Sequence, residues 1–326
     1  MPPVTRGNFV KGMIQDAYDY AMEKYDEVAT IFDQIFDTGS SDAAYEQYTS
    51  VLGPSSMTET AEGETINRKT ATEGFTVYCA NRKFADELPL TNEAIDDNQK
   101  IRNFLKTWAQ GLGEAARSTK ETSHADIFNK GGIALGDRTF NNDVNNVLST
   151  GYGNLCYDSK SFLNLTGDAR TAKSGKTYYN GVEVLNLNET NLQTLFQLIT
   201  VTNAYNEAGR RISLRPNVLI VQLGSNNWFT AKRILESPSM VSGAHSGIEN
   251  LWKGELRLIG WPFLTDSDAW FLGTAKQGLM SLARKPLTID YYEDKPTDSQ
   301  IVRGRTRFGK CVRNFRSWAG ANFSTT

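Results

Sequence analysis

The segment Ser174–Thr177 has the sequence SGKT, which matches the end of a phosphate-binding P-loop. In a P-loop, glycines let backbone N–H groups surround the phosphates while the lysine contacts the terminal phosphates. The loop also needs a glycine five residues before Gly175, where this chain has Arg170, and an apolar strand that leads into it, which is missing here. We therefore expect SGKT to form a surface turn rather than a nucleotide site.

Two aspartates, Asp266 and Asp268 in the segment TDSDAW, have the spacing of ligands in a cation site. An aspartate in a loop more commonly accepts hydrogen bonds from nearby backbone N–H groups and caps the element that follows. We expect this capping role here and predict no metal site.

The cysteines and histidines do not form a recognisable reaction centre. Cys79, Cys156 and Cys311 are far apart, odd in number and without a CxxC pair, and neither His124 nor His245 has metal-ligand spacing. This pattern argues against a disulfide framework or a zinc site and suits a reducing cytoplasm. A Cys–His nucleophile pair would also need a nucleophile elbow or a helix start beside the thiol, and neither is present. We expect neutral, buried cysteines and predict no enzymatic activity, no catalytic residue and no cofactor.

The segment Ile301–Trp318 has six basic residues, three aromatic residues and no acid. Basic residues interleaved with aromatics are typical of nucleic-acid binding. The whole chain, however, has a formal net charge of −2, so no overall basic field attracts DNA. In a strand, residues 303, 305 and 307 are arginines on one face, while residues 302, 306 and 308 share the other. We therefore predict a strand with one basic face rather than a nucleic-acid-binding tail.

The composition is that of a globular protein with a substantial core. Of 326 residues, 39% are hydrophobic and 22% are charged, which suits one large domain or two modest ones. The chain has no run of eighteen apolar residues, which is the length that would predict a membrane-spanning helix. The first ten residues, MPPVTRGNFV, lack the apolar centre of an export signal.

The N-terminal region, residues 9–39, predicts a helix with one apolar stripe that Gly39 ends. The stripe residues are Val10, Ile14, Ala17, Ala21, Tyr25, Val28, Phe32 and Ile35. This stripe packs either on the chain's own core or on a neighbouring subunit, and the sequence leaves both alternatives open.

Residues 53–88 predict a long extended excursion. Their first part is polar and nearly free of large apolar residues, and the segment FTVYCANRKF that follows alternates as a strand does. The next region predicts a long helix, which begins after a cap at Thr91 and continues to about Phe128, with a bend near Gly111 and Gly113.

The second half of the chain mixes helices and strands without a βαβ rhythm, which predicts the α+β class. Residues 131–181 are rich in turn formers, and residues 188–209 predict a helix. Val218–Leu223 predicts a short buried strand, and the helix that follows it should end before Pro238.

The order of these parts resembles the major capsid proteins of tailed bacteriophages, which share the Hong Kong 97-type fold, and most closely the Mu-like major head subunits. In that family a strand leads into the pattern T/R-x-E-x-I-x-D-D and then into a long helix with LGxAAxxTKE. The matching residues here are Glu93, Ile95, Asp96, Asp97, Leu112, Gly113, Ala115, Ala116, Thr119, Lys120 and Glu121. Residues 155–164, 209–238 and 298–321 resemble later family segments in the same order, although Ser159 replaces a usual glycine.

The resemblance implies a role for each region. Residues 1–52 would form an N-terminal arm, 53–88 an extended loop that reaches over an adjacent subunit, and 89–131 the spine helix of a peripheral domain. Residues 132–285 would form the axial domain, with some peripheral strands, and 286–326 the last peripheral strands. The arginine face of the strand near residue 305 would then lie at a shell surface and pair with acids of neighbouring subunits.

The function that the resemblance implies is a major capsid protein that self-assembles, as pentamers and hexamers, into an icosahedral shell around double-stranded DNA. The expected partners are copies of itself, the packaged DNA, and portal, scaffold or decoration proteins, with no membrane. The expected location is the virion, after assembly in the host cytoplasm. The alternative is an encapsulin-like shell of the same fold that encloses a cargo enzyme.

Overall fold

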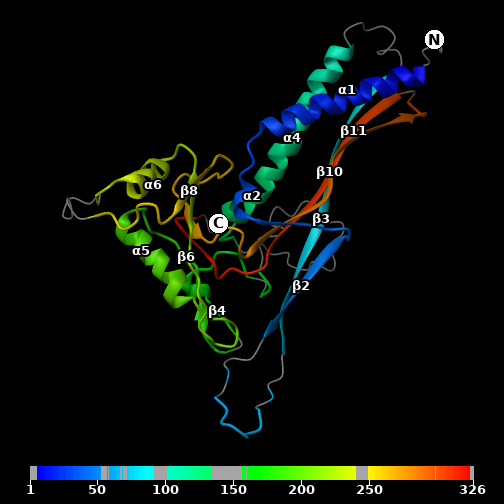
Figure 1. Cartoon of the computed structure of the whole chain (residues 1–326). Coiled ribbons are helices and arrows are strands. Elements are labelled where there is room, and N and C mark those ends of the chain that lie inside the picture. The colour runs from blue at the N-terminus through cyan, green and yellow to red at the C-terminus, as the bar shows by residue number, and fades with distance from the viewer. Residues whose placement is uncertain are drawn as a thin grey trace.

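The structure of the chain is a computed structural model. It describes residues 6–52, 57, 59–66, 68, 72–91, 101–133, 156–158, 160–172, 174–239, 249–297 and 299–323. Two five-stranded sheets form its framework, and one long helix runs from the first sheet into the core of the second (Figure 1).

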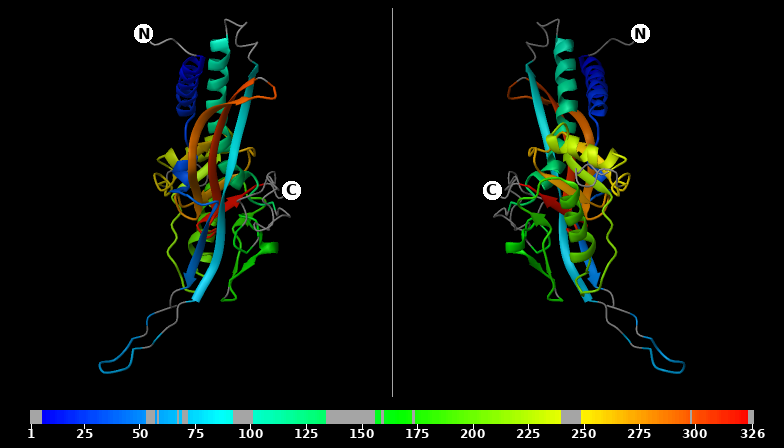
Figure 2. Two further views of the ribbon diagram at one scale, coloured as in Figure 1. Left: turned by 90° about the vertical axis from the view of Figure 1, so that its right-hand side faces the viewer. Right: turned by 90° about the vertical axis from the view of Figure 1, so that its left-hand side faces the viewer.

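The first sheet is long and supports two helices on one face. Its strand order is β1 (Asp37–Ser40), β10 (Leu279–Asp294), β11 (Ser299–Val312), β3 (Thr72–Thr91) and β2 (Tyr45–Leu52). Helices α1 (Arg6–Glu27) and α4 (Ile101–Asn129) lie together on one side of it (Figure 2). Val302 of β11 packs with Leu105 and Ala109 of α4, so the even-numbered side chains of β11 face the helices.

The second sheet is shorter and lies deeper in the molecule. Its order is β6 (Gly181–Val182), β12 (Trp318–Ala321), β9 (Trp270–Gly273), β7 (Val218–Gln222) and β8 (Arg257–Trp261). Beside it lie α5 (Glu189–Gln197), which a π-helical turn at Leu198–Thr202 continues, and α6 (Asn226–Glu236). The remaining elements are α2 (Phe32–Ile35), a 3-10 turn at Thr166–Asp168, and the two-residue strands β4 (Arg170–Thr171) and β5 (Thr177–Tyr178).

One aromatic ring links the long helix to the second sheet. Phe128, near the end of α4, is fully buried, and its ring centre lies 5.0 Å from that of Phe271, 5.4 Å from Trp318 and 5.9 Å from Trp261. These tilted and edge-on arrangements are the ones that aromatic quadrupoles favour. The helix is therefore anchored in the core of the second sheet at this end.

The predicted strand and helix after residue 217 are confirmed. The first four residues of β7 are fully buried. Helix α6 begins at a cap where the Ser225 side chain accepts from Trp228 N, and it ends at Glu236, before Pro238. Strand β12, within the range 286–326, pairs with β6 and β9 of the second sheet, whereas the division of the chain into domains stays a prediction.

The N-terminal region differs from the single predicted helix. Helix α1 ends at Glu27, α2 is a short helix, and Gly39 lies in strand β1 instead of ending a helix. The interruption coincides with a long-range contact, because the backbone N–H of Ile31 donates to the Glu121 side chain of α4 instead of continuing a helical ladder.

Helix α1 packs on α4 of its own chain. Of the two alternatives for its apolar stripe, packing on the chain's own core is therefore the one that holds for the stripe residues whose side chains are described. Ala17 and Ala21 are buried in the small core that α1 shares with α4 and the first sheet. Gly113 allows the close approach, because a Cβ there would overlap the backbone of Ala21. Stripe residues Val10 and Ile14 lie outside the side chains that the structure describes.

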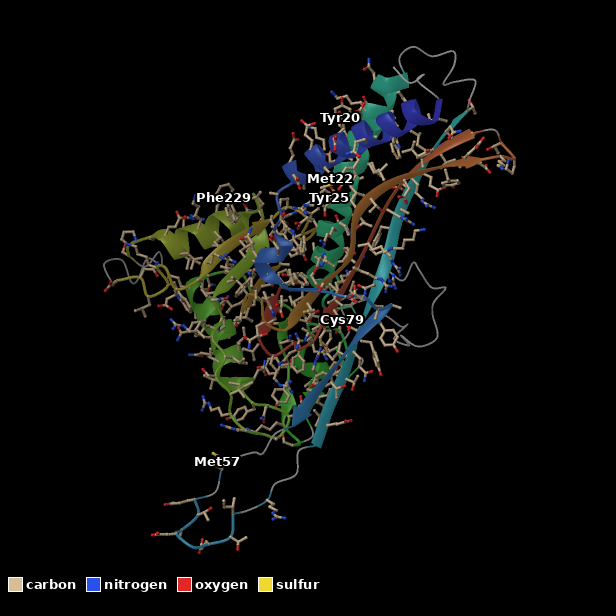
Figure 3. All side chains as sticks on the ribbon, turned by 45° about the vertical axis from the view of Figure 1, so that its right-hand side comes forward. Tyr20, Met22, Tyr25, Met57, Cys79 and Phe229 are labelled. Carbon is tan, nitrogen blue, oxygen red and sulfur yellow. A yellow bond between two sulfur atoms is a disulfide. The ribbon has the colours of Figure 1, made fainter. Side chains whose placement is uncertain are left out.

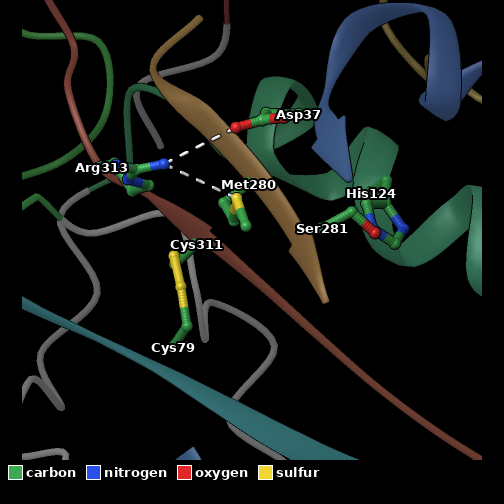
Figure 4. The surroundings of a disulfide bond; sticks show 7 residues. All are labelled: Asp37, Cys79, His124, Met280, Ser281, Cys311 and Arg313. Carbon is green, nitrogen blue, oxygen red and sulfur yellow. Dashed lines mark hydrogen bonds and ion pairs between the residues drawn. A yellow bond between two sulfur atoms is a disulfide. The ribbon is translucent and has the colours of Figure 1, made fainter. Parts of the chain in front are cut away.

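The expectation of three unpaired cysteines is wrong for two of them. Cys79 of β3 and Cys311 of β11 form a disulfide with a Cα–Cα distance of 5.3 Å (Figure 4). The sequence spacing of 232 residues hides this pair, but the strand register opposes Gly309 to Asn81 and so places position 311 opposite position 79. Cys156 is free and buried, as expected.

The sequence predicted no membrane-spanning helix, and this prediction applies to helices only. None of the helices in the described ranges combines the length and apolar character that a membrane crossing requires.

The two glycines in the middle of α4 should respond in opposite ways to alanine. Gly111 is exposed and has open space at its Cβ position, so Gly111→Ala should stabilise the chain by about 1 kcal/mol through helix propensity. Gly113→Ala should destabilise it by about 1–3 kcal/mol, because the new methyl group pushes α1 away from α4. Urea unfolding of both variants checks this, and equal effects at the two sites would refute the α1–α4 contact.

Reduction of the disulfide should lower stability. Because the bond closes a loop of 232 residues, we expect dithiothreitol to reduce the free energy of unfolding by about 2–5 kcal/mol. The double variant Cys79→Ser/Cys311→Ser should unfold at the same denaturant concentration with and without reductant. A wild-type protein that has three reactive thiols after unfolding without reductant would contradict the pairing.

Candidate functional site

The SGKT segment is a surface turn, as predicted. It lies between the two-residue strands β4 and β5, and its residues 174–177 are exposed. Gly175 adopts a φ of +79°, and Lys176 Nζ lies 3.2 Å from the ring centre of Tyr205. The lysine therefore covers a tyrosine and does not point into a phosphate cradle.

The acids of the TDSDAW segment form a backbone cap, as predicted. Asp266 Oδ1 accepts from the backbone N–H of Asp268 at 2.9 Å and from that of Ala269 at 3.3 Å. Within the residues that the structure describes, no group of three acids, histidines or cysteines is arranged to hold a metal ion.

His124 is a core residue that is held by hydrogen bonds. Its Nδ1 lies 2.7 Å from the carbonyl oxygen of Lys120 and its Nε2 lies 2.8 Å from Ser281 Oγ, with the ring stacked on Phe32. Burial lowers the pKa of His124 to about 3, so the ring stays neutral. Its two ring nitrogens contact no thiol, and His245 lies outside the described residues.

Cys156 is similarly unsuited to act as a nucleophile. Burial raises the pKa of its thiol, although Arg170 nearby acts in the opposite direction. The surrounding charges are already paired in the chain. Arg316 forms a buried ion pair with Glu207, which also accepts from Tyr157 Oη at 2.7 Å. This cluster holds the loop near residue 157 against the C-terminal segment.

Glu121 of α4 joins three parts of the molecule. Its Oε1 accepts from the backbone N–H of Ile31 at 2.8 Å, and its Oε2 accepts from Trp261 Nε1 of β8 at 3.0 Å. The residue is fully buried, and burial raises the pKa of its carboxyl group. The sequence identified Glu121 only through the family pattern, and no spacing rule would have found its role.

The basic stretch near the C-terminus divides into inward and outward residues. Lys310 is buried, its Nζ donates to the carbonyl oxygen of Ser123, and burial lowers its pKa to about 8. Arg316 is buried in its pair with Glu207. Arg303, Arg305 and Arg307 instead lie on the face of β11 that points away from α4.

Two of these outward arginines pair with acids of their own chain. Arg303 lies 3.9 Å from Glu87 of β3 and 3.5 Å from Asp290 of β10, and Arg305 lies 2.8 Å from Asp290. Acids of the same chain therefore pair with Arg303 and Arg305, whereas the sequence predicted that neighbouring subunits would supply these acids. Asp290 lies within strand β10, beside the arginines of β11.

The third outward arginine stands in a row of cations. The strand register places Arg307 directly opposite Lys83 of β3 on one side and Lys285 of β10 on the other. We call these three residues the cation row. The sequence did not indicate Lys83 or Lys285, because only the register of three strands brings them together.

A long loop projects from the molecule between β2 and β3 (Figure 3). Within its described residues, Met57 is 97% exposed and Ile66 is 77% exposed. Glu59, Glu62 and Glu64 lie between them and are also exposed. The loop thus presents acids and large apolar side chains far from the body of its own chain.

A second exposed surface lies on α6. Phe229, labelled in Figure 3, is 57% exposed. With Lys232, Arg233, Glu236 and Ser237 it lines an open hollow of about 550 Å³. The hollow thus combines an exposed aromatic ring with an arginine, two residue types that are enriched in protein–protein interfaces.

Residues 76–321 match the family model described as phage capsid protein. No curated protein matches the sequence.

Solved structures share the fold at low sequence identity. A capsid of the cyanophage P-SCSP1u is 10% identical, with 91% of this chain and 89% of that chain covered at a TM-score of 0.54. The mature capsid of bacteriophage PhiM1 is 12% identical, with 92% and 88% covered at 0.52. A virus-like particle from Pyrococcus furiosus is 8% identical, with 94% and 98% covered at 0.52.

The α+β architecture is therefore the Hong Kong 97-type fold, as the sequence predicted, whereas the Mu-like subtype stays a prediction. Because the family model covers most of the chain, the protein belongs to the phage capsid protein family and is a major capsid shell protein.

Proposed function

We propose that the chain assembles as pentamers and hexamers into a closed icosahedral shell around packaged double-stranded DNA. The observation that supports this most directly is the projecting loop, whose Met57 and Ile66 remain largely exposed among the described residues of their own chain. Large exposed apolar residues on a projecting segment favour contact with another protein. The exposed Phe229 on α6 supports a second contact between subunits.

The regions keep the roles that the sequence suggested, as proposals. Residues 53–88 form the loop that reaches an adjacent subunit, residues 89–131 the spine, and residues 132–285 most of the domain around the symmetry axes. Assembly takes place in the host cytoplasm with portal, scaffold or decoration proteins as partners. The cargo-enclosing alternative is not favoured, because the matching family is that of phage capsid proteins.

The purified protein should form capsomers or closed shells rather than a stable monomer. Multi-angle light scattering at micromolar concentrations should give masses of many chains, and negative-stain micrographs of the same fractions should show rings or shells. A mass of one chain, 36.3 kDa, over the whole concentration range would contradict the proposal.

Removal of the projecting loop should separate folding from assembly. We expect a variant in which a short Gly-Ser linker replaces Ser55–Ala71 to keep its unfolding midpoint, because the described loop residues bury almost no apolar surface. The same variant should fail to form stable shells. The matched control is a linker of the original length with the wild-type Met57 and Ile66 retained at their positions. Normal shells from the shortened variant would show that the loop has no part in assembly.

A further inference from the structure

The cation row is an unfavourable arrangement within a single chain. Lys83, Arg307 and Lys285 occupy directly opposed positions on three neighbouring strands, which lie about 4.8 Å apart. Like charges directly opposite each other in a sheet are destabilising. In the described part of the chain no ion pair joins any of the three to an acid, whereas Arg303 and Arg305 have such pairs. Arg307 Nε, like the Nε atoms of Arg303 and Arg305, is buried without a hydrogen-bond partner.

The neighbouring arginines show that this is a local feature and not a property of the whole strand. Arg303 and Arg305 lie on the same face of β11 and are balanced by Glu87 and Asp290. The excess of positive charge therefore concentrates at Arg307 and its two lysines. Lys83 and Lys285 are exposed, so a partner can reach them.

The projecting loop has an excess of negative charge. Glu59, Glu62 and Glu64 are exposed, and the three acids fall within six residues that contain no basic residue. Among the contacts between described residues, the carboxylate of Glu64 alone of the three accepts a hydrogen bond, from the backbone N–H of Ala61 at 3.4 Å.

The loop does not meet the cation row of its own chain. Strand β3 is continuous from Thr72 to Thr91, so Lys83 lies about 36 Å along the strand from the base of the loop, at 3.3 Å per residue. The loop continues beyond that base and points away from the first sheet (Figures 1 and 3). Both sets of unbalanced charges are repeated in every copy of the chain, so a second copy can balance each.

We propose that the cation row is the docking site for the acidic loop segment Glu59–Glu64 of a second copy. This inference rests on the proposed function and identifies the residues that meet in one of its contacts. Carboxylates over the row convert a repulsive arrangement into three charge-assisted contacts. The exposed Met57 and Ile66, on either side of the acids, are covered by the same neighbour.

A charge-reversal experiment on the full chain tests the docking. The row variant is Lys83→Glu/Lys285→Glu/Arg307→Glu, and the loop variant is Glu59→Lys/Glu62→Lys/Glu64→Lys. We expect each alone to lower the shell yield at least tenfold at low salt, and the two sets combined to restore it to within about threefold of wild type. The combined chain has the wild-type net charge, so a rescue reflects pairing.

A matched control distinguishes pairing from overall charge. Reversing Lys253, Lys276 and Lys295, three exposed cations outside both the cation row and the lining of the hollow on α6, changes the net charge by the same amount as the row variant. Combined with the loop variant, these reversals should restore nothing. The single substitution Arg307→Gln should leave the unfolding midpoint of unassembled subunits unchanged or raise it, because it removes cross-strand repulsion.

Several results would overturn the docking proposal while leaving the shell function intact. These are a normal shell yield from the row or the loop variant, a combined variant that assembles no better than either, and a strong loss of stability with Arg307→Gln. A row variant that assembles normally but binds duplex DNA more weakly would instead assign the row to nucleic acid. A wild-type chain that forms no shells would contradict the proposed function itself.

Discussion

The buried carboxylate of Glu121 is the interaction on which the arrangement of this subunit depends. Its two oxygens accept hydrogen bonds from the start of α2 and from the indole of Trp261 in the second sheet, while its own backbone belongs to α4. A buried carboxylate that loses a partner retains the cost of its desolvation. The N-terminal region, the long helix and the second sheet are therefore held in one relative position. Phe128, two turns further along α4, inserts into the same core and strengthens that position.

The residues around Glu121 extend this junction. Lys120 lies over the ring of Phe32, its carbonyl group binds His124, and His124 in turn binds Ser281 of β10. Lys120 thus connects α4 to α2 and, through His124, to strand β10 of the first sheet. A subunit built in this way has a stable body. Its unpaired charges and exposed large apolar side chains are concentrated on the loop, the cation row and the hollow on α6. Such a division suits a shell, in which bodies repeat and contacts are made at projecting parts.

Elements with strong local signals could be predicted from the sequence. The long helix, strand β7 and helix α6 follow from apolar spacing and Pro238. Thr91, predicted as a helix cap, is the last residue of strand β3. The caps of Asp266 and the turn at Gly175 follow from local chemistry. The break before α2 was missed, because its cause is a hydrogen bond to a residue 90 positions away. The sequence indicates a bend near Gly113 but does not reveal its close contact with α1, which depends on tertiary packing.

Strand register explains the other differences. The Cys79–Cys311 pair and the cation row both arise because β11 pairs with β3 and β10, and no local pattern specifies that pairing.

The central claim is that unbalanced charges of one subunit are balanced by the next. A cryo-EM map of the assembled shell tests it most directly. It should place the carboxylates of Glu59, Glu62 and Glu64 within about 4 Å of the Lys83, Arg307 and Lys285 side chains of an adjacent subunit. A map in which the cation row faces solvent or DNA, with the loop elsewhere, would contradict it.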